Sequence, residues 1–308
     1  MSNFKYIKNN NINRKKWNDC VSRSVNSRVY GLSWYLDIVC ENWDGIIFGD
    51  YDVVFPVIFK KIFFLKKSYH PLFCQQLGPF YKNRNVIKRK FTDLFDEILV
   101  KYFNRYIYQT TSDYDLELSK NGIYFPYWRP RTNLILDLNQ TYNEIKNGYN
   151  KNTIRNLKKS KLFNLKIVKG IDVDSFSDLY KTNLKIRKSI YSLKSLFFKN
   201  SNYLIIEKLI SVCLNKKKGQ LIAVSSQEGS IISAAFFLSC FKRKIMLFNV
   251  TKPNHKQYHA MTFLIDYFIQ SNCEEDILLD FEGSNIEGVK KFYAGFGSRD
   301  QKYSMVLR

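Results

Sequence analysis

Two carboxylates and a phenol near the end of the chain have the residue types and spacing of a proton-transfer site. Asp280 and Glu282 flank Phe281 in a predicted β-strand, so their side chains are expected on one face of the sheet. If that face borders a cleft, mutual repulsion raises the pKa of one carboxylate, which can then accept a proton from an attacking amine. The alternative is pairing with Lys or Arg at the end of the sheet. Tyr293 either protonates a departing group or packs in the core.

A basic turn between a predicted strand and a predicted helix offers a place for phosphate. The strand 245–250 runs into Lys252, Pro253 and Lys256, and a helix is expected over 258–270. Backbone N–H groups at the start of a helix attract anions, and the two lysines add charge. The alternative is a basic turn that solvates the helix end. The predicted donor-binding residues are Asn249, Val250, Lys252, Lys256, Gln257 and Tyr258.

Other kinds of catalytic site lack support in the sequence. His255 and His259 are four residues apart, but no acidic or cysteine ligand accompanies them, so no metal site is expected. There is no Gly-x-Ser-x-Gly or Ser-His-Asp arrangement, which argues against a serine hydrolase. P-loop and dinucleotide-binding glycine motifs are also absent from the sequence.

The composition indicates a globular protein that attracts anions. Lys plus Arg number 49 against 27 Asp plus Glu, which gives a net charge of +22 over 308 residues. Coenzyme A, a nucleotide-sugar precursor, tRNA and an anionic membrane surface are all partners that this charge would attract. The six cysteines are scattered singly and are expected to be free thiols. A cytoplasmic location is expected, because the sequence contains neither a long uncharged apolar run nor a signal-peptide pattern.

The length favours two α/β domains, because one domain usually takes about 100–200 residues. The polar segment 139–148 suggests a division into residues 1–138 and 139–308. Hairpins at 45–57 and 220–238 occupy comparable places in the two halves, which indicates diverged copies of one unit. Other elements expected in the first half are helices at 14–24, near Ser33 and at 86–103, and strands at 57–65, 106–110 and 132–138. In the second half we expect helices at 149–162, 175–187, 196–214, 258–270 and 286–293, and strands at 165–168, 245–250, 277–281 and 303–307.

The tail of the chain resembles the signature of the FemAB-like branch of the GNAT superfamily. Residues 279–297 contain Asp-Phe-Glu-Gly, Gly-Val and Phe-Tyr-Ala-Gly-Phe-Gly, where that branch has Asp-Phe-x-Gly, Gly-Val/Leu and Phe-Lys-x-x-Phe-Gly. The basic segment 152–161 is similar to the branch's Arg-x-x-Ile-Arg-x-Ala-x-Lys. Together these motifs cover most of residues 150–308, and a weaker match lies at 71–79.

The resemblance implies two tandem GNAT-like domains, each with a mixed, mostly antiparallel twisted sheet flanked by helices. It implies an N-acyltransferase in which an amine directly attacks acyl-CoA bound by the C-terminal domain. Backbone N–H groups around Asn249 and Val250 would bind the donor and stabilise the oxyanion where the fourth and fifth strands separate. The superfamily's Arg/Gln-x-x-Gly-x-Gly/Ala loop is absent. Two alternatives therefore stay open: an aminoacyltransferase using aminoacyl-tRNA and a peptidoglycan precursor, and a catalytically silent module that binds a polyanion.

The acceptor is expected to be an amine, such as a cell-wall or nucleotide-sugar precursor, entering between the domains. The N-terminal domain would serve the acceptor or a structural purpose, and peripheral contact with an anionic membrane is a further expectation. Arg187 resembles an acceptor-binding arginine of the family, or else complements a helix dipole. Lys290 and Lys291 precede the position where the family has lysine and this chain has Tyr293. The predicted acceptor-binding residues are Arg155, Lys158, Arg187, Lys290, Lys291, Gln75, Gln76 and Trp128.

Overall fold

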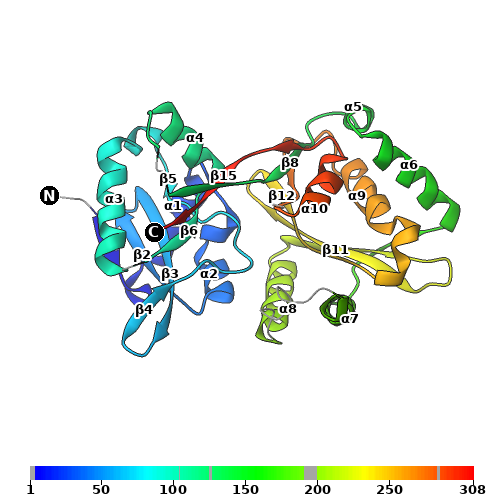
Figure 1. The fold of residues 1–308 in the computed structure, drawn as a ribbon, viewed down its shortest axis with the longest axis horizontal. Helices are drawn as coiled ribbons and strands as arrows, with labels where there is room; N and C mark the ends of the chain where they lie inside the picture. Colours follow the sequence, from blue (N-terminus) through cyan, green and yellow to red (C-terminus); the bar gives the residue numbers. More distant parts are fainter. Residues whose placement is uncertain (1–3, 104, 125–126, 191–199, 283–284) are drawn as a thin grey trace. The chain divides into compact units, whose positions relative to one another are not determined.

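The computed structural model describes residues 4–103, 105–124, 127–190, 200–282 and 285–308 (Figure 1). The chain forms two compact α/β units. Unit 1 comprises Met1–Asn133 together with Gln301–Arg308, and unit 2 comprises Leu134–Asp300.

Unit 1 contains two sheets and the helices that cover them. Its larger, antiparallel sheet has the order β1 (Phe4–Ile7), β2 (Asn42–Phe48), β3 (Val53–Ile62) and β4 (Leu65–Ser68), with β5 (Phe80–Tyr81) also beside β3. The smaller sheet places β15 (Tyr303–Leu307) between β6 (Ile107–Gln109) and β7 (Trp128–Arg131). The helices are α1 (Arg14–Arg23), α2 (Ser33–Val39), α3 (Arg89–Tyr102) and α4 (Ser112–Lys120).

The alternation of side chains along a strand explains how unit 1 covers both faces of its larger sheet. Ile46 of β2 joins the apolar cluster that includes residues of α3. The neighbouring Gly45 meets Trp17 of α1, and a Cβ at Gly45 would lie 2.7 Å from the indole ring. Trp17 is fully buried and donates a hydrogen bond of 2.8 Å to the carbonyl of Gly31. The glycine therefore makes room for the aromatic side chain that fixes α1 on the sheet.

Unit 2 is built on a seven-stranded sheet. Its order is β14 (Arg299–Asp300), β8 (Leu134–Asp137), β13 (Leu278–Asp280), β12 (Arg243–Thr251), β11 (Ile231–Cys240), β10 (Gly219–Ser225) and β9 (Lys166–Lys169). The pair β12 and β13 is parallel, and the other neighbouring pairs are antiparallel. The helices are α5 (Tyr142–Asn147), α6 (Lys151–Ser160), α7 (Val173–Ile190), α8 (Asn200–Asn215), α9 (Ala260–Gln270) and α10 (Glu287–Ala294).

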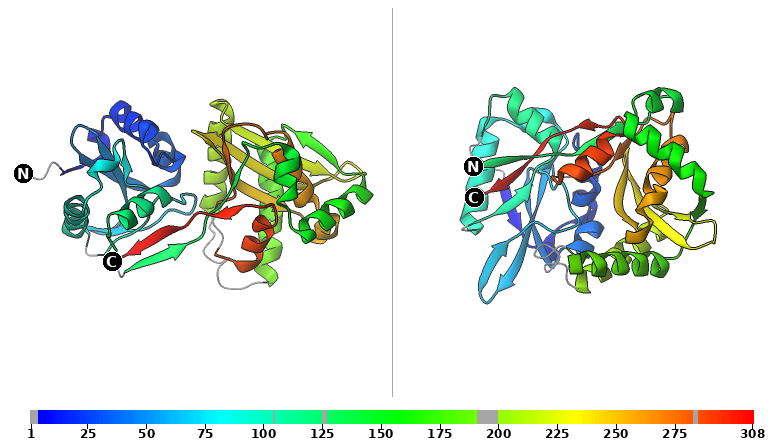
Figure 2. Two further views of the ribbon diagram at one scale, coloured as in Figure 1. Left: turned by 90° about the horizontal axis from the view of Figure 1, so that it is seen from above. Right: turned by 45° about the vertical axis from the view of Figure 1, so that its right-hand side comes forward.

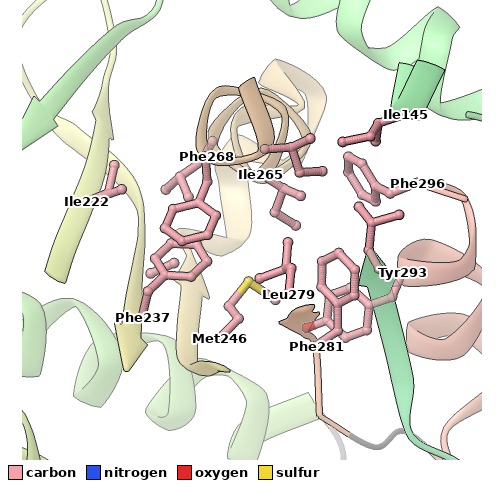
Figure 3. Packing of buried hydrophobic residues seen from close by; sticks show 14 of the residues in the cluster. Ile145, Ile222, Phe237, Met246, Ile265, Phe268, Leu279, Phe281, Tyr293 and Phe296 are labelled. Atoms are coloured by element: carbon pink, nitrogen blue, oxygen red, sulfur yellow. The ribbon is translucent and has the colours of Figure 1, made fainter. Parts of the chain in front are cut away.

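Helices cover both faces of this sheet. Helix α9 packs on β10, β11 and β12 with α6 alongside it, whereas α7 and α8 lie on the opposite face (Figures 1 and 2). Under α9, the rings of Phe237 and Phe268 stack with centroids 3.6 Å apart (Figure 3). Both rings are buried, so this contact joins the sheet to the helix.

Most predicted elements are present, and the main differences have local causes. Residues 142–147, in the polar segment that suggested the division between domains, form α5, because Thr141 and Glu144 make a reciprocal capping box. Residues 253–258 form a 3₁₀ turn, and α9 begins only after His259, which has φ +52°. The sequence analysis did not anticipate β1, α4 or β7.

The division between the units differs from the predicted boundary after residue 138. Strand β8 pairs with β13 and β14, which places residues from Leu134 onward in unit 2. Strand β15 pairs with β6 and β7, which returns the end of the chain to unit 1. Pairing between strands that are distant in sequence thus decides to which unit β8 and β15 belong.

The six cysteines are free thiols, as predicted, and four of them are buried. Burial raises the pKa of Cys20 and of Cys240 to about 11. Across the part of the chain that the structure describes, no helix has the length and apolarity needed to span a bilayer.

The stacked pair in unit 2 gives a test of the fold. Truncation of Phe268 to alanine leaves a void between α9 and the sheet and should lower stability by about 3–5 kcal/mol. Hydrogen exchange of the amides of α9 and β11 measures the change within unit 2. Leu162→Ala, at an exposed side chain, should change this free energy by less than about 0.5 kcal/mol. Equal protection in the two variants would contradict the central position of this contact.

Candidate active site

The candidate site lies where two parallel strands separate. Strands β12 and β13 pair from Arg243 and Leu278 to Ile245 and Asp280. Beyond this point β12 continues along β11 as far as Thr251, while the chain after Asp280 follows β8 instead. The N–H of Phe281 donates to the carbonyl of Leu134, and the N–H of Leu134 donates to the carbonyl of Glu282. The second half of β12 is thereby released from β13, as the family resemblance implied.

A buried ion pair links the paired part of the two strands, from Arg243 at its first position to Asp280 at its last. The guanidinium of Arg243 lies 2.7 Å from Oδ2 of Asp280, and both side chains are buried. The other carboxylate oxygen of Asp280 accepts a 2.9 Å hydrogen bond from the N–H of Glu282. Asp280 is therefore a structural anchor rather than the free base that the sequence first suggested. Pairing with a basic residue, the alternative interpretation, is what the structure contains.

Glu282 does not share a strand face with Asp280. Strand β13 ends at Asp280, and Glu282 has φ +59°, which turns the chain into the left-handed region. The alternation expected over residues 280–282 is broken for this reason. The half-buried carboxylate of Glu282 is near enough to Tyr293 for its negative charge to raise the pKa of that phenol.

The separation of the strands leaves backbone donors facing outward from β12. The N–H of Lys252 donates to Ile232 on β11 over 2.9 Å. Backbone groups alternate sides along a strand, so the N–H of Val250 also faces β11, whereas those of Asn249 and Thr251 face away from it. Of the two residues predicted to supply these donors, Asn249 therefore faces the required way, whereas the N–H of Val250 is turned to β11 and Thr251 offers one in its place. The carbonyl of Thr251 on the same side accepts a hydrogen bond from Nδ2 of Asn183 on α7.

A cavity of about 250 Å³ lies beside these donors, entirely within unit 2. Its walls come from strand β12 and from helices α7 and α10. Of the predicted site residues, Asn249, Val250 and Tyr293 line it together. The remaining lining residues are Thr251, Tyr180, Asn183, Gly288, Val289 and Phe292. Tyr180 and Asn183 were missed, although their spacing of three puts two polar groups on one face of a helix.

Two contacts hold Tyr293 in place in the cavity. Its ring stacks on Phe281 at 4.9 Å (Figure 3), and its hydroxyl oxygen accepts a 3.1 Å hydrogen bond from Nδ2 of Asn249. Burial, followed by the charge of Glu282, raises the pKa of Tyr293 to about 12, although the hydrogen bond from Asn249 opposes this rise. The hydroxyl is consequently neutral at physiological pH and keeps its own hydrogen for donation.

The predicted donor-binding turn follows β12 directly. Lys252 and Tyr258 are half-buried, and Lys256 and Gln257 are exposed. The ring of Tyr258 packs on Phe163 at 4.7 Å. This turn leads into α9, whose N-cap residue, His259, makes no side-chain capping hydrogen bond.

Helix α6 adds positive charge beside the start of α9. The pKa of His259 is lowered by burial and then by the charges of Lys159 and Arg155. Arg155 was predicted to bind the acceptor, but the structure puts it near the donor-binding turn. Together with Lys252 and Lys256, these cations favour an anionic ligand at the start of α9.

Other predicted acceptor residues are less directly connected to the cavity. Lys290 pairs with Asp300 at 3.3 Å, and Lys291 pairs with Glu287 at 2.6 Å on the helix surface. Lys158 is exposed on α6. The side chain of Arg187 lies outside the described residues.

The predicted acceptor residues of the first domain are engaged within unit 1. Nε2 of Gln75 donates to Oδ1 of Asn133, and Oε1 of Gln75 accepts from Nε2 of Gln76. Both glutamines are buried, so their amide groups hold the interior of unit 1 together and are not presented to a ligand. Trp128 lies in β7 with its half-buried ring 6.2 Å from that of Tyr114.

A larger cavity, of about 520 Å³, lies in unit 1. Its walls carry charges of both signs, including Lys66, whose ammonium group lies 2.8 Å from Asp44. None of the residues that the sequence singled out lines it. In the described part of the chain, no group of three or more His, Cys, Asp or Glu residues could hold a metal ion.

Comparisons with solved structures identify the fold. The chain is similar to FemX, with 10% identity over 95% of this chain and 96% of that one, and a TM-score of 0.63. It is also similar to the C-terminal domain of a putative lysylphosphatidylglycerol synthetase from Agrobacterium fabrum, with 10% identity, coverage of 96% and 90%, and a TM-score of 0.58. A GCN5-related N-acetyltransferase from Sphaerobacter thermophilus aligns at 7% identity over 100% and 96%, with a TM-score of 0.50. No family model and no curated protein matches the sequence.

These similarities show a GNAT-type fold, shared with FemX, as predicted from the motifs near the end of the chain. The alignments span both units, since they cover nearly the whole chain. The strand separation in unit 2 is the part of this fold that creates the candidate site.

The ion pair between the two strands can be tested by removing one charge or both. Asp280→Asn removes the carboxylate that pairs with the buried Arg243 and should destabilise unit 2 by about 3–5 kcal/mol. Adding Arg243→Met removes the buried charge and should recover most of that loss. Hydrogen exchange of β12 and β13 amides measures both variants. Equal stability of Asp280→Asn and wild type would contradict the anchoring role.

Proposed function

We propose that this protein is an N-acyltransferase that moves an acyl group from acyl-CoA to an amine by direct attack. The observation that carries the proposal is the parting of β12 and β13 beside a cavity lined by Asn249, Thr251 and Tyr293. The GNAT-type fold supports a transferase, since solved structures with this fold include an N-acetyltransferase.

The donor would lie along the free edge of β12. Its phosphates would meet Lys252, Lys256 and the start of α9, where Arg155 adds charge. The free N–H groups of β12 lie about 6.6 Å apart along the strand, so the acyl carbonyl would accept from one of Asn249 and Thr251, and another acceptor of the donor would take the second. Fixed donors of this kind stabilise negative charge that develops on oxygen in the transition state.

The chemical step forms one bond and breaks another. The amine nitrogen attacks the thioester carbon, the C–N bond forms, and the C–S bond breaks to release the thiolate. The proton lost by the amine passes to Glu282, which takes over the role of base because Asp280 is committed to Arg243. No oxidant, reductant or metal enters this balance.

Tyr293 would act as a hydrogen-bond donor to the departing sulfur. A phenol with a pKa of about 12 gives up its proton poorly to a thiolate, since thiols have pKa values near 8.5. The sequence left two roles open for Tyr293, proton donation and core packing, and its burial favours hydrogen-bond donation over full proton transfer to sulfur. Because Asn249 already donates to its oxygen, the Tyr293 hydrogen is directed to a different acceptor.

A second candidate function follows from the raised pKa of Tyr293. An ester donor such as aminoacyl-tRNA leaves as an alkoxide, which is far more basic than a thiolate and could take a proton from Tyr293. The exposed cations of α6, including Lys158 and Lys159, would suit a longer polyanion. Transfer of an amino acid to a peptidoglycan precursor is therefore the alternative to acyl-CoA chemistry.

Donor binding is the first test. Calorimetric titration with acetyl-CoA, longer acyl-CoAs and coenzyme A, at moderate salt to screen nonspecific attraction, should show saturable binding. Lys252→Ala with Lys256→Ala should weaken it about tenfold or more, whereas Lys208→Ala with Lys218→Ala, at exposed lysines elsewhere in unit 2, should not. Saturable binding of aminoacyl-tRNA without acyl-CoA binding would favour the ester alternative, and binding of neither would count against transfer chemistry.

Catalytic roles can then be separated by two substitutions. Glu282→Gln removes the base and should lower kcat about 10²- to 10⁴-fold. Tyr293→Phe keeps the ring on Phe281 but removes the donor, and should lower kcat about 10²- to 10³-fold with little change in KM. The rate should show no loss from Tyr293 ionisation below about pH 10, since its pKa is raised. Normal turnover in both variants would refute these assignments, and Lys208→Ala, at an exposed lysine without an assigned role in unit 2, serves as the control.

A further inference from the structure

The hairpin of β3 and β4 in unit 1 ends in a group of apolar side chains exposed to solvent. Ile62 and Leu65 form its last pair, with Phe63 and Phe64 in the turn. Phe63 is 95% exposed, Phe64 is fully exposed and Leu65 is 73% exposed. The hairpin projects from the body of unit 1 (Figures 1 and 2). Single exposed apolar residues are ordinary, but a contiguous group of this kind indicates an interaction surface.

The turn itself runs against local preference. Two-residue hairpin turns favour Asn-Gly or similar residues, because they require positive φ. Here Phe63 has φ +52°, which costs a residue with a side chain about 1–2 kcal/mol. Neither phenyl ring recovers this cost by burial in the folded chain. The two residues are therefore better explained by a partner than by folding.

Four lysines surround the base of this apolar tip. Lys60 pairs across the strands with Lys67, and Lys61 pairs with Lys66. Since neighbouring residues of a strand point to opposite faces, each face of the hairpin carries one lysine pair. Like charges directly opposite one another destabilise a sheet, so an external anionic surface would relieve both pairs.

Internal carboxylates neutralise only part of this charge. Lys66 lies 2.8 Å from Asp44, and Lys60 lies 3.5 Å from Glu41. Lys61 and Lys67 are exposed, and no carboxylate of the described residues lies within ion-pair distance of either. One free cation therefore remains on each face of the hairpin.

The spacing of apolar and basic residues matches the depth of a membrane interface. A strand rises about 3.3 Å per residue, so the lysines lie roughly 5–10 Å behind the phenyl rings. Interfacial segments bury their apolar side chains about 5–10 Å deep, at the boundary of headgroups and acyl chains. At that depth Lys61 and Lys67 would lie among the headgroups, where each contributes about 1 kcal/mol to binding an anionic leaflet.

We propose that this hairpin docks unit 1 onto the surface of an anionic lipid bilayer, with Phe63 and Phe64 inserted into the interface and Lys61 and Lys67 among the headgroups. A bilayer surrounds an inserted tip on all sides, which accounts for cations on both faces of the hairpin. The net charge of +22 would bring the protein to the same surface. This inference goes beyond the proposed transfer reaction and is independent of it, because its residues lie in unit 1 and the candidate active site lies in unit 2.

Sedimentation with lipid vesicles tests the docking surface directly on the full-length chain. We expect binding to vesicles of phosphatidylcholine mixed with phosphatidylglycerol, and much weaker binding to phosphatidylcholine alone. Phe63→Asn with Phe64→Ser removes the apolar tip while asparagine tolerates positive φ, and should weaken binding about tenfold or more. Lys61→Glu with Lys67→Glu should weaken it by a similar factor and reduce its dependence on salt.

Matched variants separate the hairpin from the charge of the whole protein. Leu72→Asn alters another exposed apolar residue of unit 1, and Lys15→Glu with Lys120→Glu makes the same change in net charge at exposed positions outside the hairpin. Both controls should bind nearly as well as wild type, and circular dichroism should show all variants folded. Wild-type binding to neither kind of vesicle would overturn the proposal and leave the tip as a surface for a protein partner. Equal losses in the hairpin variants and their controls would also overturn it.

Discussion

The geometry of unit 2 depends on two parallel strands that must pair at one end and part at the other. Arg243 is at the first paired position of β12 and Asp280 is at the last paired position of β13, and their buried ion pair ties the two strands together along the paired stretch. The second oxygen of Asp280 holds the N–H of Glu282, so one carboxylate both closes the pair and turns the chain toward β8. The free edge of β12, the cavity and the approach of Glu282 to Tyr293 all follow from this arrangement.

Local sequence patterns predicted most elements because their causes are local. The apolar stripe of α3, the hairpin of β10 and β11, and β15 all follow from periodicity and turn residues. The motifs near the end of the chain also predicted the GNAT-type fold. Three of the residues predicted for the site, Asn249, Val250 and Tyr293, line one cavity. Two copies of an α/β unit were expected, and two compact units are present.

What the sequence could not give depends on contacts between distant residues. Asp280 looked like half of a carboxylate pair, because nothing near it in sequence reveals Arg243 as its buried partner. Gln75 and Gln76 looked available for recognition until the structure showed them bonded to Asn133, to one another and to Ser112. Tyr180 and Asn183 reach the cavity only because α7 packs on β12. Burial and pairing of this kind are tertiary properties, which periodicity does not encode.

The position of β15 constrains how the protein can fold during synthesis. Its backbone completes the small sheet of unit 1 by pairing with both β6 and β7, yet it follows all of unit 2 along the chain. While the ribosome is still making unit 2, β6 and β7 must wait with unpaired edges, which are the kind of surface that promotes misassembly. Unit 1 therefore cannot finish folding first, and the maturation of the two units is linked by the order in which their strands emerge.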